Sequence, residues 1–409
     1  MISAHINTKF TLGQQQGTTV IPDTSPLQIV ACRHWKVAMP FREALQWGSG
    51  SRPATTRLVV EITLANGIKG YGETICLLDF IEPVLVNTIF PIALEHTADD
   101  IERFTRHVLG AGYYHHKRAA VMAMAAVEMA MWDAKGRHWG SPLWSLWGGA
   151  YRHEVEVSAY LFGTDQTRLA ASALAFMDQG YRSFKVKIGM GAESDIANVA
   201  TVRRVVGDLA LRADVNSAWT PGTARRTLEK LKPYDLQYIE QPLELDDLLG
   251  HAQLRQMQPV PVALDESAYT LADVGNIVRM GAADVILLDP HEIGGLWQTI
   301  KAAAMAEAAG IPVTLHSGGE LGFSQAAYVH LAASIPNMSI AIDSERDYLS
   351  GDVVTQPPQV MDGRLALPQE PGLGVTPDFA LLDKHRTERI QDPYLDRARP
   401  GWFSTKPAY

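Results

Sequence analysis

The chain has 409 residues, of which 46% are hydrophobic and 20% charged, and its formal net charge is −9 at pH 7. This length suits two or three domains, and the negative charge argues against binding to the phosphate backbone of nucleic acid as the main function. The longest apolar stretch, residues 119–127, is too short to span a bilayer, and the first 16 residues lack the apolar core of a secretory signal. The two cysteines, Cys32 and Cys76, have no metal-type spacing. We therefore expect a soluble, cytoplasmic protein that binds neither nucleic acid nor membranes.

The first part of the chain is predicted to be an α+β unit. Residues 58–64 alternate apolar and polar side chains, an Asn-Gly pair supplies a two-residue turn, and residues 68–74 return, which predicts a β-hairpin. Residues 97–140 then show helical spacing. Strands followed by helices predict an α+β domain over residues 27–150.

After residue 150 the pattern changes to short β-branched strands that alternate with helical stretches. The starts of successive strands differ by 24 to 28 residues, which is the size of one βα unit. The eight predicted strands are residues 155–161, 183–189, 209–216, 236–242, 260–266, 284–290, 312–317 and 339–343.

Eight consecutive βα units close most economically into a TIM-type (β/α) barrel, which we predict over residues 151–350. The helices are clearest at residues 193–206 and 293–310, whereas the eighth helix has no clear pattern. An open doubly wound sheet is the competing topology. The absence of a glycine-rich fingerprint after the first strand disfavours it.

Ionisable side chains are expected at the ends of seven of the eight strands. In a barrel of this kind the active site is built at the C-terminal ends of the strands. A single Asp at such a place commonly caps the next helix, but so many at one end indicate a functional site. The residues are Lys185, Lys187, Asp214, Glu240, Asp265, Glu266, Asp289, His291, His316 and Asp343.

Three carboxylates are predicted to converge from adjacent strands. Asp214, Glu240 and Asp265 are 26 and 25 residues apart, one βα unit each. Converging carboxylates repel one another unless a cation lies between them, and a site of oxygen ligands suits Mg²⁺. The alternative is that each carboxylate pairs with a separate lysine or arginine in a structural network.

Candidate bases are predicted on either side of these carboxylates. Lys185 and Lys187 are two residues apart and point to the same face of their strand, and each lowers the pKa of the other, so Lys187 could be neutral near pH 7. Asp289 and His316 could form a dyad in which the carboxylate orients the imidazole. A cation flanked by two bases suits removal of a proton next to a carboxylate.

Together these motifs resemble the enolase superfamily, in its mandelate racemase and muconate lactonizing enzyme branch. The motifs are Lys-x-Lys at 185–187, Asp-x-Asn at 214–216, Ile-Glu-Gln-Pro at 239–242, Leu-Asp-Glu-Ser at 264–267 and the distal Asp/His pair. The resemblance extends over about residues 27–380. It implies an α+β capping domain, a TIM-type barrel and a C-terminal segment, residues 351–409, that returns to the capping domain. Residues 1–26 are expected to form a flexible arm.

The resemblance also implies roles for individual residues. Lys187, with Lys185 beside it, looks like one base, and His316 with Asp289 looks like the other. Asp214, Glu240 and Asp265 look like Mg²⁺ ligands, although Glu266 is an alternative to Asp265. The substrate-binding residues implied are Asn216, Glu266, His291 and Asp343.

The function implied is Mg²⁺-dependent removal of the proton alpha to the carboxylate of a small acid, through an enediolate. Residues 289–291 and 341–343 look like those of acid sugar dehydratases of the glucarate dehydratase type, which implies conversion of a sugar acid to a 2-keto-3-deoxy acid. The same site could serve a racemase or epimerase of a hydroxy acid, or a sugar-lactone cycloisomerase. A more distant alternative is a non-catalytic binding protein on the same barrel. We also expect a homo-oligomer.

Two further segments invite a functional interpretation. Residues 40–52, with Arg42 and Arg52, match the position of the family's mobile capping loop, where an arginine would pair with the distal acid of a diacid or sugar acid. Residues 115–118, His-His-Lys-Arg, are interpreted as a solvated helix start or subunit contact rather than a metal or phosphate site.

Overall fold

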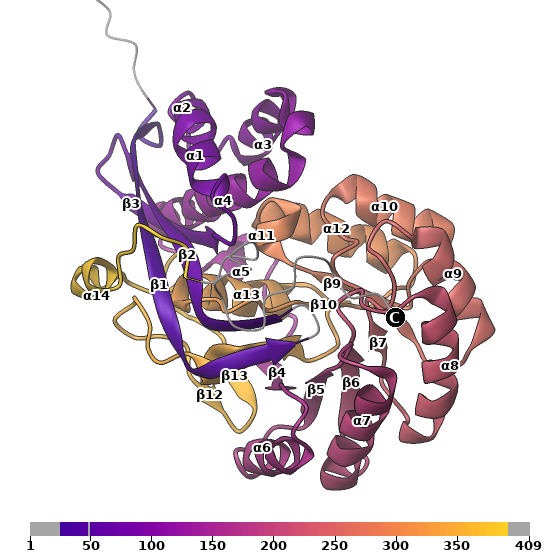
Figure 1. Cartoon of the computed structure of the whole chain (residues 1–409). Helices are drawn as coiled ribbons and strands as arrows, with labels where there is room; N and C mark the ends of the chain where they lie inside the picture. The colour runs from indigo at the N-terminus through magenta and orange to yellow at the C-terminus, as the bar shows by residue number, and fades with distance from the viewer. Residues whose placement is uncertain (1–24, 48–49, 392–409) are drawn as a thin grey trace, which may run out of the picture.

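The computed structural model describes residues 25–47 and 50–391. A β-barrel surrounded by helices forms one part of the molecule, and an antiparallel sheet with its own helices lies against it (Figure 1). We call the described residues up to 150 the capping region. The flexible arm predicted for residues 1–26 lies outside the described residues except for its last two positions. Within the described part of the chain, no helix has the length and apolar character needed to cross a membrane.

The capping region begins with a three-stranded antiparallel sheet in the order β1-β2-β3. β2 (Gly50–Leu64) and β3 (Lys69–Ile75) are the predicted hairpin. β1 (Ile29–Trp47) was not predicted from the sequence, although its side chains alternate between buried and half-buried or exposed from Trp35 to Phe41. That alternation is typical of a strand with one face on the core.

Helices cover one face of this sheet. The bounds are α1 (Ile81–Val84), a π-helical turn (Leu85–Ile89), α2 (Phe90–Ala93), α3 (Ile101–Gly110), a 3₁₀ turn (Tyr113–His115), α4 (Lys117–Trp139) and α5 (Leu143–Leu146). α4 packs closely on β3 because Gly70 and Gly72 have no side chain. A Cβ at Gly72 would lie 2.0 Å from the carbonyl oxygen of Ala126, so only glycine allows this approach.

The barrel consists of eight parallel strands, as predicted. The strands are β4 (Glu154–Leu161), β5 (Ser183–Lys187), β6 (Ala210–Asp214), β7 (Ile239–Glu240), β8 (Val262–Leu264), β9 (Val285–Leu288), β10 (Val313–Leu315) and β11 (Ile342–Asp343). Consecutive strands pair from β4 to β10, and β11 pairs with β4. The Thr314 hydroxyl of β10 donates to the Ala341 carbonyl, 3.0 Å away, just before β11. The ring is therefore closed, which confirms the TIM-type barrel over the open sheet.

Helices follow seven of the barrel strands. They are α6 (Gln166–Asp178), α7 (Ala192–Val206), α8 (Pro221–Leu231), α9 (Leu248–Met257), α10 (Leu271–Met280), α11 (Pro290–Ile293) with α12 (Leu296–Ala308), and α13 (Gly322–Ser334). The predicted helix at 293–310 begins three residues later, because Gly294 and Gly295 have φ angles of 95° and 122° that break the helical path. Only a 3₁₀ turn (Arg346–Tyr348) follows β11.

The C-terminal segment contacts both parts of the molecule. β12 (Val360–Met361) pairs with β13 (Arg364–Ala366), which pairs antiparallel with the first residues of β4. α14 (Phe379–Lys384) then lies beside β1 (Figure 1). The Phe379 ring packs 5.8 Å from that of Trp35, centroid to centroid, and the backbone N–H of Ala38 donates to the carbonyl of His385.

Buried carboxylates of the capping region satisfy the backbone of barrel helices. Glu128 of α4 accepts from the backbone N–H groups of Leu296 (2.7 Å) and Trp297 (2.9 Å), at the start of α12. Glu73 of β3 accepts from Leu321 and Ser324, at the start of α13. The first N–H groups of a helix have no partner within it, and a negative charge there is favourable. These contacts orient the capping region on the barrel.

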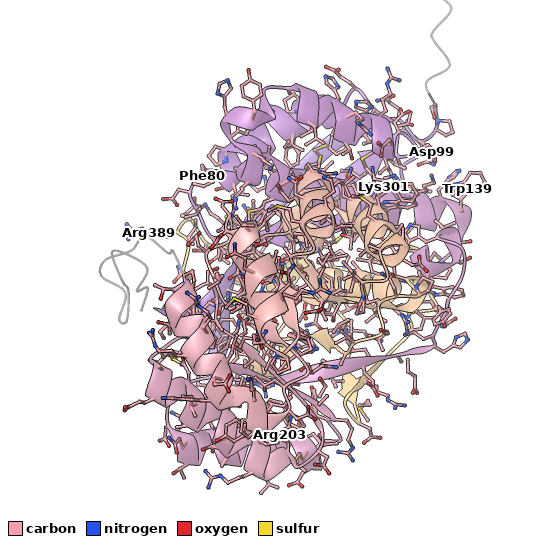
Figure 2. The ribbon with its side chains drawn as sticks, turned by 90° about the vertical axis from the view of Figure 1, so that its right-hand side faces the viewer. Phe80, Asp99, Trp139, Arg203, Lys301 and Arg389 are labelled. Carbon is pink, nitrogen blue, oxygen red and sulfur yellow. The ribbon has the colours of Figure 1, made fainter. Side chains whose placement is uncertain are left out.

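A more exposed contact joins the same two parts. Lys301, labelled in Figure 2 on α12, donates to the Oε2 atom of Glu102 on α3 at 2.6 Å. Because both side chains are partly open to solvent, this pair contributes less than the buried ones.

Replacing Glu128 with Ala should lower the free energy of unfolding by about 2–4 kcal/mol, because two backbone donors and the Trp132 indole N–H lose their acceptor. Urea denaturation measures this. Lys135→Ala on the same helix removes the partly exposed pair with Asp99 and the contact of the amine with the Trp132 ring, 5.1 Å from its centroid. It is the control and should cost less than about 1 kcal/mol. Equal effects of the two substitutions would contradict the structural role of Glu128.

Candidate active site

A cavity of about 360 Å³ lies between the capping region and the C-terminal ends of the barrel strands. Its barrel side is polar and includes five predicted site residues: Lys187, Asn216, Asp265, Glu266 and His316. Its capping side is largely apolar. It includes Ile75, Leu77, Leu78, Phe80, Ile81 and Met122, together with Trp47, Arg52 and Arg118. Phe80 is 49% exposed and lies at the edge of the capping region (Figure 2). The cavity therefore has charged groups on its barrel side, and both hydrocarbon side chains and two arginines on its capping side.

Lys185 lies beneath the cavity and is completely buried. Its Nζ atom donates to Glu240 (2.5 Å) and Asp343 (2.8 Å) and lies 3.1 Å from an oxygen of Asp214. Burial alone would lower the pKa of Lys185, but these three carboxylates raise it well above its usual value. Lys185 is therefore an ammonium that holds the carboxylates together.

Lys187 reaches the cavity from the same strand. Its Nζ atom donates to Asp214 (2.5 Å) and to the side-chain carbonyl of Asn216 (3.3 Å). Asn216 has a φ angle of 47°, in the left-handed region, where a non-glycine residue needs support from its surroundings. Its backbone N–H donates to Asp214 and its side-chain amide donates to Glu266. The end of β6 thus fixes the position of the Lys187 amine.

His316 and Asp289 form the predicted pair. The Nδ1 atom of His316 lies 3.3 Å from Asp289 Oδ2, and its Nε2 atom lies 3.7 Å from Asp265 Oδ2. Asp289 also accepts from the Tyr328 hydroxyl at 3.1 Å. Burial would lower the pKa of His316, but the charges of Asp265 and Asp289 raise it well above its usual value. These carboxylates therefore favour the imidazolium form of His316, whose Nε2 atom faces Asp265 at the cavity wall.

Asp214, Glu240 and Asp265 come from three adjacent strands, as predicted, but lysine and histidine side chains lie among them. Within the described residues, no three His, Cys, Asp or Glu side chains are arranged as a ready metal site. The Oε2 atom of Glu240 is buried and has no hydrogen-bond partner. Burial, and then the charge of Asp214, raises the pKa of Glu240 well above its usual value, and burial raises that of Asp265 to about 7. Crowded carboxylates with an unpartnered oxygen fit a divalent cation that prefers oxygen ligands.

Two residues predicted to bind substrate do not line the cavity. Asp343 accepts from Lys185, from the Tyr160 hydroxyl (2.7 Å) and from Arg212 (2.8 Å), all beneath the cavity floor. The ring of His291 lies in the first turn of α11 with its Nε2 atom 2.8 Å from Arg57 Nη2. Burial and the Arg57 charge lower the pKa of His291 to about 3. Both side chains are directed into the interior.

In the predicted capping loop, residues 40–47 belong to the end of β1 and residues 50–52 to the start of β2, and Trp47 pairs with Gly50. Arg42 donates to the carbonyl of Leu349, which follows β11. Arg52 forms a buried ion pair with Glu345, and its guanidinium lies 5.2 Å from the centroid of the Phe41 ring. The charge of Arg52 is thus compensated within the protein.

Three supporting residues were not found from the sequence. Arg212, on the same face of β6 as Asp214, could have been found from the two-residue period of a strand. Tyr160 pairs in register with Lys185 across β4 and β5, which no pattern within one strand reveals. Tyr328 reaches Asp289 from α13, and the sequence carries no signal for that contact.

The fold and this cavity define a TIM-barrel protein in which lysine, histidine and carboxylate side chains meet under a capping region. Comparison with known families identifies it further. The family model "Mandelate racemase / muconate lactonizing enzyme, N-terminal domain" matches residues 28–148, and "Enolase C-terminal domain-like" matches residues 168–381. The chain belongs to the mandelate racemase and muconate lactonizing enzyme family of the enolase superfamily, as the sequence motifs predicted. It is an enzyme of the carboxylate-anion chemistry that this family shares.

Similar proteins catalyse different reactions. A probable glucarate dehydratase of Streptomyces coelicolor is 30% identical over 381 residues, covering 84% of this chain and 86% of that protein. An N-succinylamino acid racemase of Amycolatopsis sp. is 32% identical over 371 residues, covering 87% and 96%. A solved enolase from Pseudomonas fluorescens with bound magnesium, potassium and tartrate is 25% identical, with a TM-score of 0.82 over 93% of this chain and 99% of that one. The family is therefore established, whereas the particular reaction has to be inferred from the residues of the site.

Replacing Asp343 with Ala should lower the free energy of unfolding by about 3–5 kcal/mol, because Lys185 and Arg212 would keep buried charges with one partner fewer. Chemical denaturation measures the change. Glu154→Ala, which removes an exposed ion pair with Arg364, is the control and should change stability by less than about 1 kcal/mol. Unchanged stability with weaker substrate binding would instead support the substrate-binding role predicted from the sequence.

Proposed function

We propose that this enzyme removes the proton alpha to the carboxylate of a small acid, through an enediolate, and that it dehydrates a sugar acid to a 2-keto-3-deoxy acid. One observation carries the proposal. Lys187, on β5, and His316, after β10, line the same cavity, although four strands separate β5 from β10 on one side of the ring and two on the other. A substrate between them would meet a different proton-transfer group on each face.

The side chains then have distinct roles. In its neutral form, Lys187 takes the α-proton at Nζ. His316 donates the proton on Nε2 to the departing β-hydroxyl, which leaves as water, and the resulting enol rearranges to the 2-keto acid. Asp289 is a positioning residue, because its bond to Nδ1 directs the Nε2–H of His316 toward the cavity. Lys185 keeps Asp214 and Glu240 in place.

We further propose that Mg²⁺ is held by Asp214, Glu240 and Asp265, with Glu266 as the alternative to Asp265. When bound, Mg²⁺ supplies positive charge beside the substrate carboxylate, which stabilises negative charge as the proton is lost. The unpartnered oxygen of Glu240 and the raised pKa of Asp265 support this choice. Glu266 accepts from the Asn216 amide at 3.0 Å, so its proposed role is to bind substrate hydroxyls together with Asn216.

The apolar wall of the cavity favours a second candidate reaction. Hydroxyl groups of a sugar acid need polar partners when buried, and the side chains from Ile75 to Ile81 that line the cavity are all hydrophobic. A racemase, epimerase or cycloisomerase acting on an acid with fewer hydroxyls would use the same two proton-transfer groups. The first step is common to both candidates.

Chelation of divalent cations should abolish activity, and added Mg²⁺ should restore it. Asp214→Asn and Glu240→Gln should weaken Mg²⁺ binding at least about 10-fold in a calorimetric titration, because each removes a charged ligand. Asp265→Ala should weaken it more than Glu266→Gln does. The opposite order would move the third ligand to Glu266, and full activity in metal-free buffer would exclude the proposed site.

Lys187→Ala and His316→Asn should each stop product formation, with losses of about 10²–10⁴-fold or more. One of the two variants should still exchange the α-proton of the substrate with deuterium from the solvent, because that variant keeps the base for the first step. NMR follows both the exchange and the products. Accumulation of a 2-keto acid supports dehydration, whereas inversion at the α-carbon without keto acid establishes the second candidate.

A further inference from the structure

Four basic side chains line the cavity, and three of them contact carboxylates. Arg52 is paired with Glu345, Lys187 with Asp214, and His316 with Asp265 and Asp289. The fourth is Arg118. Among the residues that the structure describes, Arg118 has no ion pair and no hydrogen bond from its guanidinium. Its side chain is exposed, so it brings to the cavity wall a positive charge that no direct ion pair occupies, although Glu266 and Glu292 line the same cavity.

The position of Arg118 leaves its donors available. Its Cζ atom lies 3.8 Å from the centroid of the Tyr269 ring, on the opposite wall of the junction between capping region and barrel. The Tyr269 hydroxyl in turn donates to Glu292 Oε1 at 2.9 Å, which fixes the ring. A guanidinium above an aromatic ring can still bind a carboxylate with two parallel hydrogen bonds through N–H groups that the ring does not occupy.

The start of α4 is held in place beside this arginine. Lys117, the preceding residue, forms an ion pair with Asp273 of α10 at 3.2 Å. No acidic side chain occurs in the first turn of α4, so the positive end of the helix adds to the charge of Arg118. Lys117 does not line the cavity, so it provides a matched control for charge alone.

We propose that Arg118 binds a second, distal carboxylate of the substrate, so that the enzyme acts on dicarboxylic acids. This inference rests on the proposed function, in which the first carboxylate lies at the end of the cavity near Lys187 and Asp265. The apolar side chains that line the same cavity would contact the carbon chain. Arg118 is thus assigned the task that the sequence suggested for Arg42 or Arg52, since Arg52 is already neutralised by Glu345.

The test compares acids that differ only at the distal end. Two matched pairs serve as probes: galactarate with galactonate, and 2-hydroxyglutarate with 2-hydroxypentanoate. Calorimetric titration with Mg²⁺ present should show tighter binding of the diacid in each pair. Arg118→Gln should raise the Kd of the diacid about 10- to 100-fold and leave that of the monoacid within about threefold. Arg118→Lys, which keeps the charge but not the planar fork, should recover part of the loss.

Lys117→Gln should change neither Kd. Equal affinity for diacid and monoacid in the wild-type enzyme, or an equal loss for both in Arg118→Gln, would overturn the inference. Because a Kd is measured without turnover, the result for Arg118 can be distinguished from the result for the proposed reaction. Diacid binding that depends on Arg118 without any α-proton exchange would refute the reaction and keep the inference, whereas turnover of a monoacid that is insensitive to Arg118 would do the reverse.

Discussion

Negative charge is concentrated at the C-terminal end of the barrel, and its compensation by Lys185 is the interaction on which the site depends. Asp214, Glu240 and Asp343 all contact the buried amine of that one lysine. Without it, carboxylates at such distances would be protonated or would move apart. The barrel therefore holds the ammonium of Lys185 below the cavity. The groups proposed to exchange protons with the substrate, Lys187 and His316, line the cavity itself.

The two lysines of the Lys-x-Lys motif therefore lie at different depths relative to the cavity. Lys185 has no access to a substrate, whereas Lys187 is at the cavity surface. The same division separates Asp289, which is directed inward to Tyr328 and His316, from Asp265 at the cavity wall. Similar residue types thus have structural or chemical roles according to whether a substrate can reach them.

Much of the fold was predictable because it follows from the periodicity of the sequence. The regular spacing of strand starts predicted all eight barrel strands, and the motifs predicted the family. Features that depend on a partner far away in the sequence were not predictable. Asp343 and His291 were expected at the substrate, yet Arg212 and Arg57 bind them in the interior. Arg118 was interpreted as part of a solvated helix start or subunit contact, and its side chain is indeed exposed. Its contact with Tyr269 was not predictable, because it depends on how α4 meets the barrel. β1 was not predicted, although apolar side chains occupy every second position from Trp35 to Phe41.

The carboxylates of the capping region have a consequence for folding. Glu73 and Glu128 provide acceptors for the N-terminal backbone groups of α13 and α12, and α14 returns from the far end of the chain to β1. Neither part can complete its hydrogen bonding alone. The capping region, the barrel and α14 should thus unfold in a single cooperative transition. The barrel is not an independent module that could be transferred to another protein without the capping region.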